Sequence, residues 1–353
     1  MSHPIRSGRI GVLAVGLGIG AALASTPQIA SADPSADPFS WADQVLSGLA
    51  VPADPTSPLD MQISISGIDL FSTVDNTATA NSGFGDIAIA IGNGANANAS
   101  GGILDFAFAN GTDSTAGAGL AGNFDIAFAN GDNSDAGAGV SGNFDIAAAD
   151  GAGSTAGAGI GSNFDIATAI GIGSKSDAGV GGGLDIATAV GAGSSANAGL
   201  GQFDAATAVG AGSSASTAGN LDTAFVNGID SEASAGGGSV DIALANGNNL
   251  DAIANGGSDA AIVSGTNAEA EAIGIGDIAS VVNTGSAFDE AVAGGAIPFS
   301  DNNLALIIGT GSTALAGADP TTAGDWDLAA VFGDMLHASA TGGNFLLDIL
   351  PSL

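Results

Sequence analysis

Aspartate is the residue type with which this sequence could most readily do chemistry, because it recurs at a nearly constant interval. The intervals are 19 residues, then 20 four times, then 19, 18, 19, 18 and 18. The members of this Asp row are Asp86, Asp105, Asp125, Asp145, Asp165, Asp185, Asp204, Asp222, Asp241, Asp259 and Asp277. Stacked on neighbouring strands, two such carboxylates would lie ~5 Å apart and repel by about 0.9 kcal/mol even in water. The pattern therefore requires an interaction that offsets this repulsion.

Two interpretations of the Asp row follow from the chemistry of a carboxylate. In the structural one, each Asp accepts backbone N–H hydrogen bonds at a turn. In the functional one, Ca²⁺ bridges successive coils, and the candidate ligands are Asp125, Asp145, Asp165 and Asp185. Only Gly181–Asp185 resembles the known calcium-binding nonapeptide, so we favour the structural role. We predict no cofactor, with calcium at these four Asp residues as the alternative.

Catalytic residues of other kinds are scarce. The chain has no Cys and no Tyr, and His337 is the only His beyond the N-terminal segment. A Ser-His-Asp or Cys-His arrangement therefore has no spare members. Paired carboxylates could hydrolyse a glycosidic bond, but three Lys and Arg residues offer little with which to clamp a sugar. We predict that the protein is not an enzyme, with a polysaccharide-active enzyme as a distant alternative.

The segments around the Asp row repeat with it, as in Asn123–Gly142, NFDIAFANGDNSDAGAGVSG. Two residues after each Asp of the row stands an Ala, and six residues after it a Gly in ten of eleven repeats. Gly tolerates a left-handed turn, so each repeat is predicted to hold a strand, a tight corner and a second strand. A period near 20 is typical of solenoids. The sequence thus predicts an all-β fold, a β-solenoid over residues 61–285 with about 18–20 residues per coil.

The first strand of each repeat is apolar on both faces. One face carries Phe124, Ile126 and Phe128, and the other carries Ala127 and Ala129 beside the Asp. We favour the large residues inward, packed against the small Ala of the second strand, which leaves an Ala plane edged by Asp outside. The reverse would expose a Phe and Ile plane. In either case the protein would present an apolar strand face suited to self-association or to an envelope or host-surface partner.

Both ends of the chain depart from the repeat. Arg6 and Arg9, the apolar stretch 10–24 and the Ala30-Ser31-Ala32 site predict a signal peptide over residues 1–32; a short membrane anchor is the alternative. Residues 33–60 are a Pro-rich leader with a short capping helix at 38–49. Residues 286–353 are predicted to hold a closing strand at 304–309 and a hydrophobic cap with helical spacing at 325–337.

Composition bounds the partners and the location. Acidic residues number 36 and the formal net charge is −33, so nucleic acid is excluded as a partner. No run after the signal peptide could span a bilayer as a helix, so we predict a secreted or envelope-associated protein with no transmembrane span. The function predicted is an exported, non-enzymatic structural or interaction protein, with a Ca-dependent surface adhesin as the alternative.

Two resemblances agree with this interpretation. The coil Ala189–Ala198, AVGAGSSANA, resembles the A-I-G-x-x-A-x-A coils of trimeric adhesin heads, which implies a β-roll. The whole chain, with its signal peptide, Gly/Ala-rich Asn-Gly repeats and hydrophobic tail, resembles secreted mycobacterial Gly/Ala-rich repeat proteins akin to PGRS tracts, without a PE domain. That resemblance implies export, with the signal peptide as its route.

Overall fold

A computed structural model describes the chain from residue 60 onwards. The described residues are 60–171, 174–179, 181–191, 194–210, 213–228, 230, 232–247, 249–265, 268–282, 289–294, 302–309, 311–317, 326–340 and 347–351. The predicted signal peptide and the capping helix of the leader lie outside these residues. Within them, no helix is long and apolar enough to cross a membrane.

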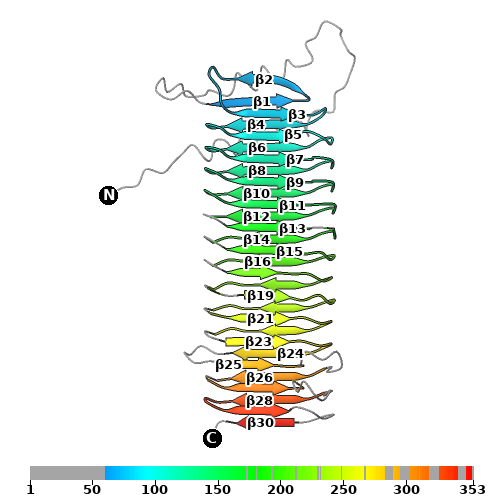
Figure 1. Cartoon of the computed structure of the whole chain (residues 1–353), viewed down its shortest axis with the longest axis vertical. Helices are drawn as coiled ribbons and strands as arrows, with labels where there is room; N and C mark the ends of the chain where they lie inside the picture. Colours follow the sequence, from blue (N-terminus) through cyan, green and yellow to red (C-terminus); the bar gives the residue numbers. More distant parts are fainter. Residues whose placement is uncertain are drawn as a thin grey trace, which may run out of the picture. The chain divides into compact units, whose positions relative to one another are not determined.

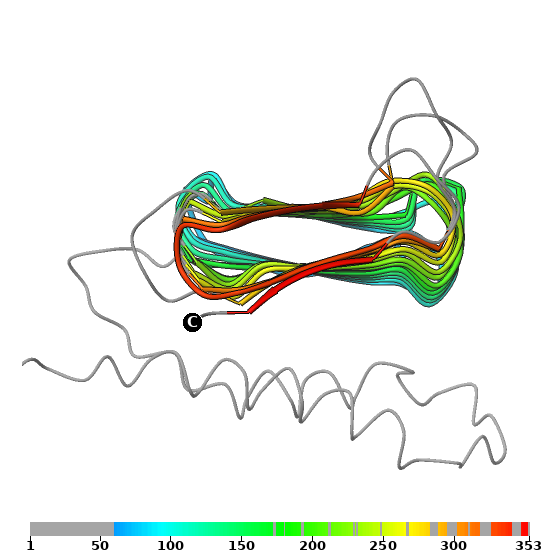
Figure 2. The ribbon, with the colours of Figure 1, turned by 90° about the horizontal axis from the view of Figure 1, so that it is seen from below.

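The described chain winds into a β-solenoid built from two facing sheets (Figures 1 and 2). Sheet A has 16 strands in the order β2-β1-β4-β6 and onwards through the even numbers to β30, and sheet B has 14 strands from β3 to β29. Sheet A consists of β1 Met61–Ile65, β2 Ile68–Ser72, β4 Ile87–Ile91, β6 Phe106–Asn110, β8 Ile126–Asn130, β10 Ile146–Asp150, β12 Ile166–Ile170, β14 Ile186–Ala189, β16 Ala205–Ala208, β18 Thr223–Phe225, β20 Ile242–Leu244, β22 Ala260–Ile262, β24 Ile278–Val282, β26 Leu304–Ile308, β28 Leu328–Phe332 and β30 Leu347–Pro351.

Sheet B takes the second strand of each coil. Its members are β3 Thr79–Ser82, β5 Asn96–Ala99, β7 Thr115–Ala118, β9 Asp135–Ala138, β11 Thr155–Ala158, β13 Lys175–Ala178, β15 Ser195–Ala198, β17 Ser214–Ser216, β19 Glu232–Ala235, β21 Asp251–Ala254, β23 Ala268–Ala272, β25 Asp289–Val292, β27 Thr313–Ala316 and β29 His337–Ala340. Successive strands pair in parallel and in register, so Ala127 lies beside Ala147 and Ala136 beside Ala156. The predicted solenoid with its coil of 18–20 residues is confirmed.

The two ends of the solenoid differ from the predicted caps. At the N-terminal end, β1 pairs antiparallel with both β2 and β4, so a hairpin closes sheet A. At the C-terminal end, the helical spacing predicted for 325–337 is wrong for the described residues, because β28 and β29 are strands that continue the two sheets. Leu328 and Phe332 point outward and Ala329 and Val331 inward, which is a strand period. The solenoid therefore continues beyond residue 285.

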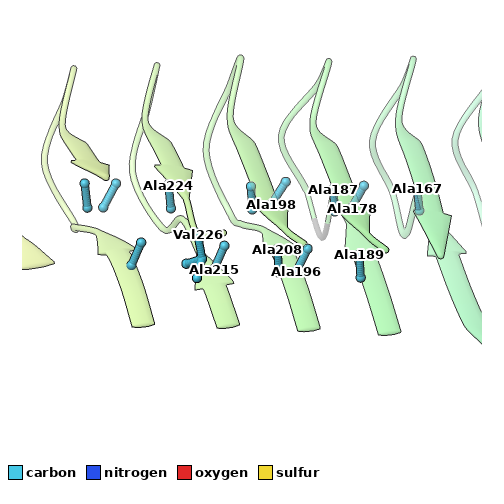
Figure 3. Packing of buried hydrophobic residues seen from close by; sticks show 14 of the residues in the cluster. Ala167, Ala178, Ala187, Ala189, Ala196, Ala198, Ala208, Ala215, Ala224 and Val226 are labelled. Atoms are coloured by element: carbon cyan, nitrogen blue, oxygen red, sulfur yellow. The ribbon is translucent and has the colours of Figure 1, made fainter. Parts of the chain in front are cut away.

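The core is made of alanine from both sheets. Ala127 and Ala129 of β8 and Ala136 of β9 are fully buried, and Figure 3 shows Ala187, Ala189, Ala196 and Ala198 meeting between the layers. The prediction that Phe and Ile face inward is therefore wrong. Since the inward side chains of these strands are alanine methyl groups, the two sheets lie close together in cross-section (Figure 2), and Phe or Ile would not fit between them there.

Candidate functional site

The Asp row lies inside the solenoid, at the corner where the chain enters each strand of sheet A. Every member from Asp86 to Asp277 is at most 2% exposed. Oδ1 of Asp125 accepts the backbone N–H of Asp145 at 3.0 Å, and Oδ1 of Asp145 accepts that of Asp165 at 3.1 Å. The same bond joins most other neighbours along the row. The predicted structural role, a carboxylate accepting backbone N–H groups at a turn, is confirmed.

Glycines make room for each carboxylate. A Cβ at Gly142, three residues before Asp145, or at Gly159, fourteen residues after it, would fall on the Asp145 carboxylate. The same pair recurs as Gly122 and Gly139 around Asp125. We call this pair the glycine notch. In one coil the first glycine is replaced by Ser162, whose hydroxyl donates to the Asp165 carboxylate.

Burial alters the protonation of the row. Desolvation is the main cause that raises the pKa of Asp125 to about 6 and of Asp145 and Asp185 to about 7, and the neighbouring carboxylates add to it. Desolvation likewise raises the pKa of Asp165. Oδ2 of Asp125 and of Asp145 is buried without a hydrogen-bond partner. Part of the row is therefore protonated near neutral pH. Protonation reduces the repulsion between neighbouring carboxylates that the spacing of the row implies.

Where both corners are described, a coil turns twice through the same four-residue geometry. The Ser turn, Gly131–Ser134 and its equivalents, leads into sheet B, and the Asp turn, Gly142–Asp145 and its equivalents, leads into sheet A. In both turns the third residue is left-handed, with φ of 57° at Asn133 and 65° at Phe144. In both turns the N–H of that residue donates to the preceding coil, from Asn133 to Thr112 O and from Phe144 to Asn123 O.

The residues at the left-handed position differ between the two turns. The Ser turn uses Asp, Asn or Gly there, at Gly94, Asp113, Asn133, Gly153, Asp230, Asn249 and Gly311, with Met335 as an exception. Apart from Gly85, Ser258, Gly276 and Asn302, the Asp turn uses large apolar residues there, at Leu104, Phe124, Phe144, Phe164, Leu184, Phe203, Leu221, Val240 and Trp326. Left-handed conformation is unfavourable for such residues by roughly 1–2 kcal/mol. These side chains are also 41–64% exposed, so burial does not explain their choice.

The outer surface of sheet A from β4 to β28 is an apolar face. Exposed large residues on it are Phe128, Ile146, Ile170, Ile186, Ile242, Ile262, Ile278, Val282, Ile308 and Phe332. Phe106 and Phe128 contact across neighbouring strands with ring centroids 5.3 Å apart. Along its edge, Phe124, Phe144 and Phe164 stack at 4.9 and 5.1 Å. Among the outward positions of these strands, Asp150 is the one charged residue, and it accepts from Asn130 at 2.7 Å.

The outer surface of sheet B is polar and acidic instead. Glu232, Asp251, Glu269 and Glu290 lie side by side in register on four consecutive strands. Desolvation, followed by the charges of Glu232 and Glu269, raises the pKa of Asp251 to about 6. Lys175 pairs with Asp177 on its own strand at 3.2 Å. His337 is exposed at the start of β29.

The four calcium candidates thus lie in one line, but they are buried inside the solenoid and not on its surface: Asp125, Asp145, Asp165 and Asp185. Among the described residues, no group of three or more His, Asp or Glu side chains has the arrangement of a metal site. One oxygen of Asp125, Asp145 and Asp165 is already engaged by a backbone N–H or a hydroxyl. Calcium binding stays a prediction.

Sequence reasoning missed several members of the site. The Asp row continues after Asp277, since Asn303 donates its N–H to Asp277 Oδ1 at 2.7 Å and Asp327 donates to Asn303 Oδ1 at 3.0 Å. The longer coils, 26 and 24 residues, concealed these positions. The glycine three residues before most members of the row was a visible signal, and so was the large apolar residue immediately before each Asp from Asp105 to Asp241.

Comparison of the chain with models of protein families, with curated proteins and with solved structures finds no match.

Proposed function

We propose that the chain is an exported, non-enzymatic structural and interaction protein of the cell envelope or extracellular space, and that it meets its partner through the apolar face of sheet A. The observation that carries the proposal is the segregation of side chains between the two outer surfaces. Monomeric soluble proteins rarely expose a continuous apolar patch larger than a few hundred Å². Export rests on the predicted signal peptide 1–32, and the resemblance to secreted Gly/Ala-rich repeat proteins supports the same location.

The left-handed Phe and Leu residues support the proposal independently. At the Ser turn, Asn and Gly fill the equivalent position without strain. Keeping Phe124, Phe144 and Phe164 half-exposed in that conformation strains the backbone, and their stacking on one another offsets part of that strain. An outward contact that uses these rings would account for them, because aromatic residues are enriched in the buried centres of interfaces.

Exposed residues of each face can be replaced by residue types that already occur at the same register position in other coils. Phe128→Thr places Thr in the register position of Thr168. Ile186→Thr and Ile242→Thr place it in the register position of Thr223. The matched control, Thr115→Asn, Thr155→Asn and Ser195→Asn, uses the sheet B column in which Asn96 already stands beside Thr115. Both triple variants should keep the melting temperature of the wild type within a few degrees, because all six sites face outward.

The test is fractionation of cells that produce the full chain. We expect a mature protein beginning at Asp33 in the envelope or surface fraction, release of the sheet A variant into the medium, and retention of the sheet B variant. A protein that stays in the cytoplasm would refute export. An unchanged distribution of the sheet A variant would refute the apolar face as the surface that retains the protein in the envelope.

Calcium dependence is a separate question, addressed by melting with and without EDTA. The hydrogen bonds of the Asp row give it a structural role without a metal. An unchanged melting temperature would remove the Ca-dependent adhesin as an alternative.

A further inference from the structure

We propose that the apolar face of sheet A binds the same face of a second copy of this chain, forming a two-fold dimer of solenoids. This inference rests on the proposed function, in that it names the partner of the apolar face. Three observations favour a second copy over an unlike protein or a lipid surface: the spacing of the face, the placement of charge and the area available.

The spacing of the outward side chains on this face matches the spacing on the same face of a second copy. Outward residues stand in straight columns, for example Ile126, Ile146, Ile166 and Ile186 in register on consecutive strands. Strands repeat every ~4.8 Å, so the surface is a series of ridges and grooves with that period. A second copy carries ridges of the same period along the whole length, and dry packing between such faces is the arrangement of paired β-sheets.

The distribution of negative charge favours this face for contact between two copies, because the outer surface of sheet B is acidic. The chain has a formal net charge of −33, so copies repel one another over most of their surface. On sheet B the outward residues include Asp135, Asp177, Glu232, Asp251, Glu269, Glu271 and Glu290. On sheet A from β4 to β28, Asp150 is the only charged residue among the outward positions of the strands. Face-to-face packing of two sheets A places both acidic surfaces on the outside, in water.

The area is large enough for a stable dimer. Strands β4 to β28 extend about 60 Å at ~4.8 Å per strand, and a strand of about five residues is roughly 16 Å long. Each copy thus offers about 1,000 Å² and the pair about 2,000 Å², above the roughly 1,600 Å² of a standard interface. An isologous contact also closes, since each face is consumed by its partner and no further copy can add to it.

Analytical ultracentrifugation of the mature chain, residues 33–353, tests the proposal. We expect twice the monomer mass, with tighter association at high salt because screening weakens the acidic repulsion. The triple variant Phe128→Thr, Ile186→Thr and Ile242→Thr should weaken association at least tenfold, and the sheet B control should not. A wild type that stays monomeric at every concentration and salt level overturns the dimer.

Single cysteines locate the contact, because the natural chain has none. Thr207→Cys lies on β16, the middle strand of the face, and Ser214→Cys lies on β17 of sheet B. A short bismaleimide should join two copies of the Thr207→Cys variant and leave Ser214→Cys uncrosslinked. Dimers that crosslink only through Ser214→Cys would overturn the assigned face.

Other occupants give other results, and each overturns the dimer. A monomer whose cysteine at position 207 resists maleimide has the face covered by its own chain. A monomer that floats with phosphatidylcholine vesicles uses the face on lipid. A monomer that is still retained in the envelope fraction leaves the proposed function intact.

A dimer that is released into the medium, by contrast, supports the second copy as the partner of this face and refutes retention in the envelope.

Discussion

The Ser turn and the Asp turn have the same backbone and opposite chemistry. Ser134 and Asp145 are both buried as the fourth residue of their turns, and both bind backbone groups of a neighbouring coil. The residue before them is Asn133 in one case and Phe144 in the other, at nearly the same φ. The Ser turn follows the ordinary preferences of its conformation. The Asp turn departs from them twice, with a buried carboxylate and an exposed ring.

This difference indicates which turn serves the coil alone. A small hydroxyl needs little room, and an Asn in left-handed conformation carries little strain. A buried carboxylate needs space, which Gly142 and Gly159 provide for Asp145. Burial makes its ionisation less favourable, and a left-handed Phe adds strain. Substitutions that remove one departure at a time separate its contribution to folding from its contribution to binding.

The largest effect is expected where the glycine notch is filled. Gly139→Ala places a Cβ on the Asp125 carboxylate at a φ of +66°, combining overpacking with left-handed strain, so we expect a loss of about 3 kcal/mol or more. Gly137→Ala, two residues earlier, places its Cβ in open space and should be neutral or stabilise by up to about 1 kcal/mol. Urea unfolding checks both, and equal losses would contradict the notch.

Protonation of the Asp row gives the next effect. Since the folded pKa of Asp125, Asp145 and Asp185 lies above the ordinary value of 3.8, the folded chain binds more protons than the unfolded chain between about pH 4 and 7. The stability from these groups is therefore fully present below pH 4 and lost as pH rises through 7. We expect the calorimetric melting temperature to fall by several degrees from pH 5 to pH 8.

Asp145→Asn isolates the charge in that prediction. The amide keeps an acceptor oxygen for the Asp165 N–H, as Asn303 does for Asp327. The variant should melt above the wild type at pH 8 and match it at pH 4, whereas Asp145→Ala should melt lower at both values because it leaves a buried N–H unpaired. A wild type that becomes more stable as pH rises would refute the raised pKa.

The sequence predicted the architecture well, and the reason is periodicity. Asp, Ala and Gly recur together because every coil must repeat the backbone of the one before it. The orientation of β8 was predicted wrongly because a large residue was assumed to fill the core. The column of Ala127 is constant in volume from coil to coil, whereas the column of Phe128 varies through Ala148, Thr168 and Leu244. Core positions stacked in register vary less: the inward position of Ala129 stays aliphatic and becomes Val226, Val281 or Ile307 in later coils. That contrast was available in the sequence.

Other features could not be predicted from the sequence. The turn geometry that buries Asp145 depends on a left-handed Phe144, which local propensity argues against. The strands of 325–337 resemble a helix in spacing because Leu328, Val331 and Phe332 are three and four residues apart. Their place is set by pairing with β26, a contact made between distant parts of the chain.

The smallest effect tests the left-handed residues themselves by exchanging them between the two turns. Val240 is β-branched at a φ of 64° and has no ring to stack, so Val240→Asn should stabilise the solenoid by about 1 kcal/mol. Asn133→Val, exposed in the Ser turn, should destabilise it by about the same amount. Phe144→Asn should change little, because the lost stacking on Phe124 and Phe164 offsets the relief of strain.

The same variants separate folding from binding. If the exposed apolar residues of the Asp turn serve an interface, Val240→Asn gains stability and loses association, which ultracentrifugation and urea unfolding of one sample measure together. If they serve the fold, stability and association decrease together, and the contrast between the two turns then reflects packing between coils.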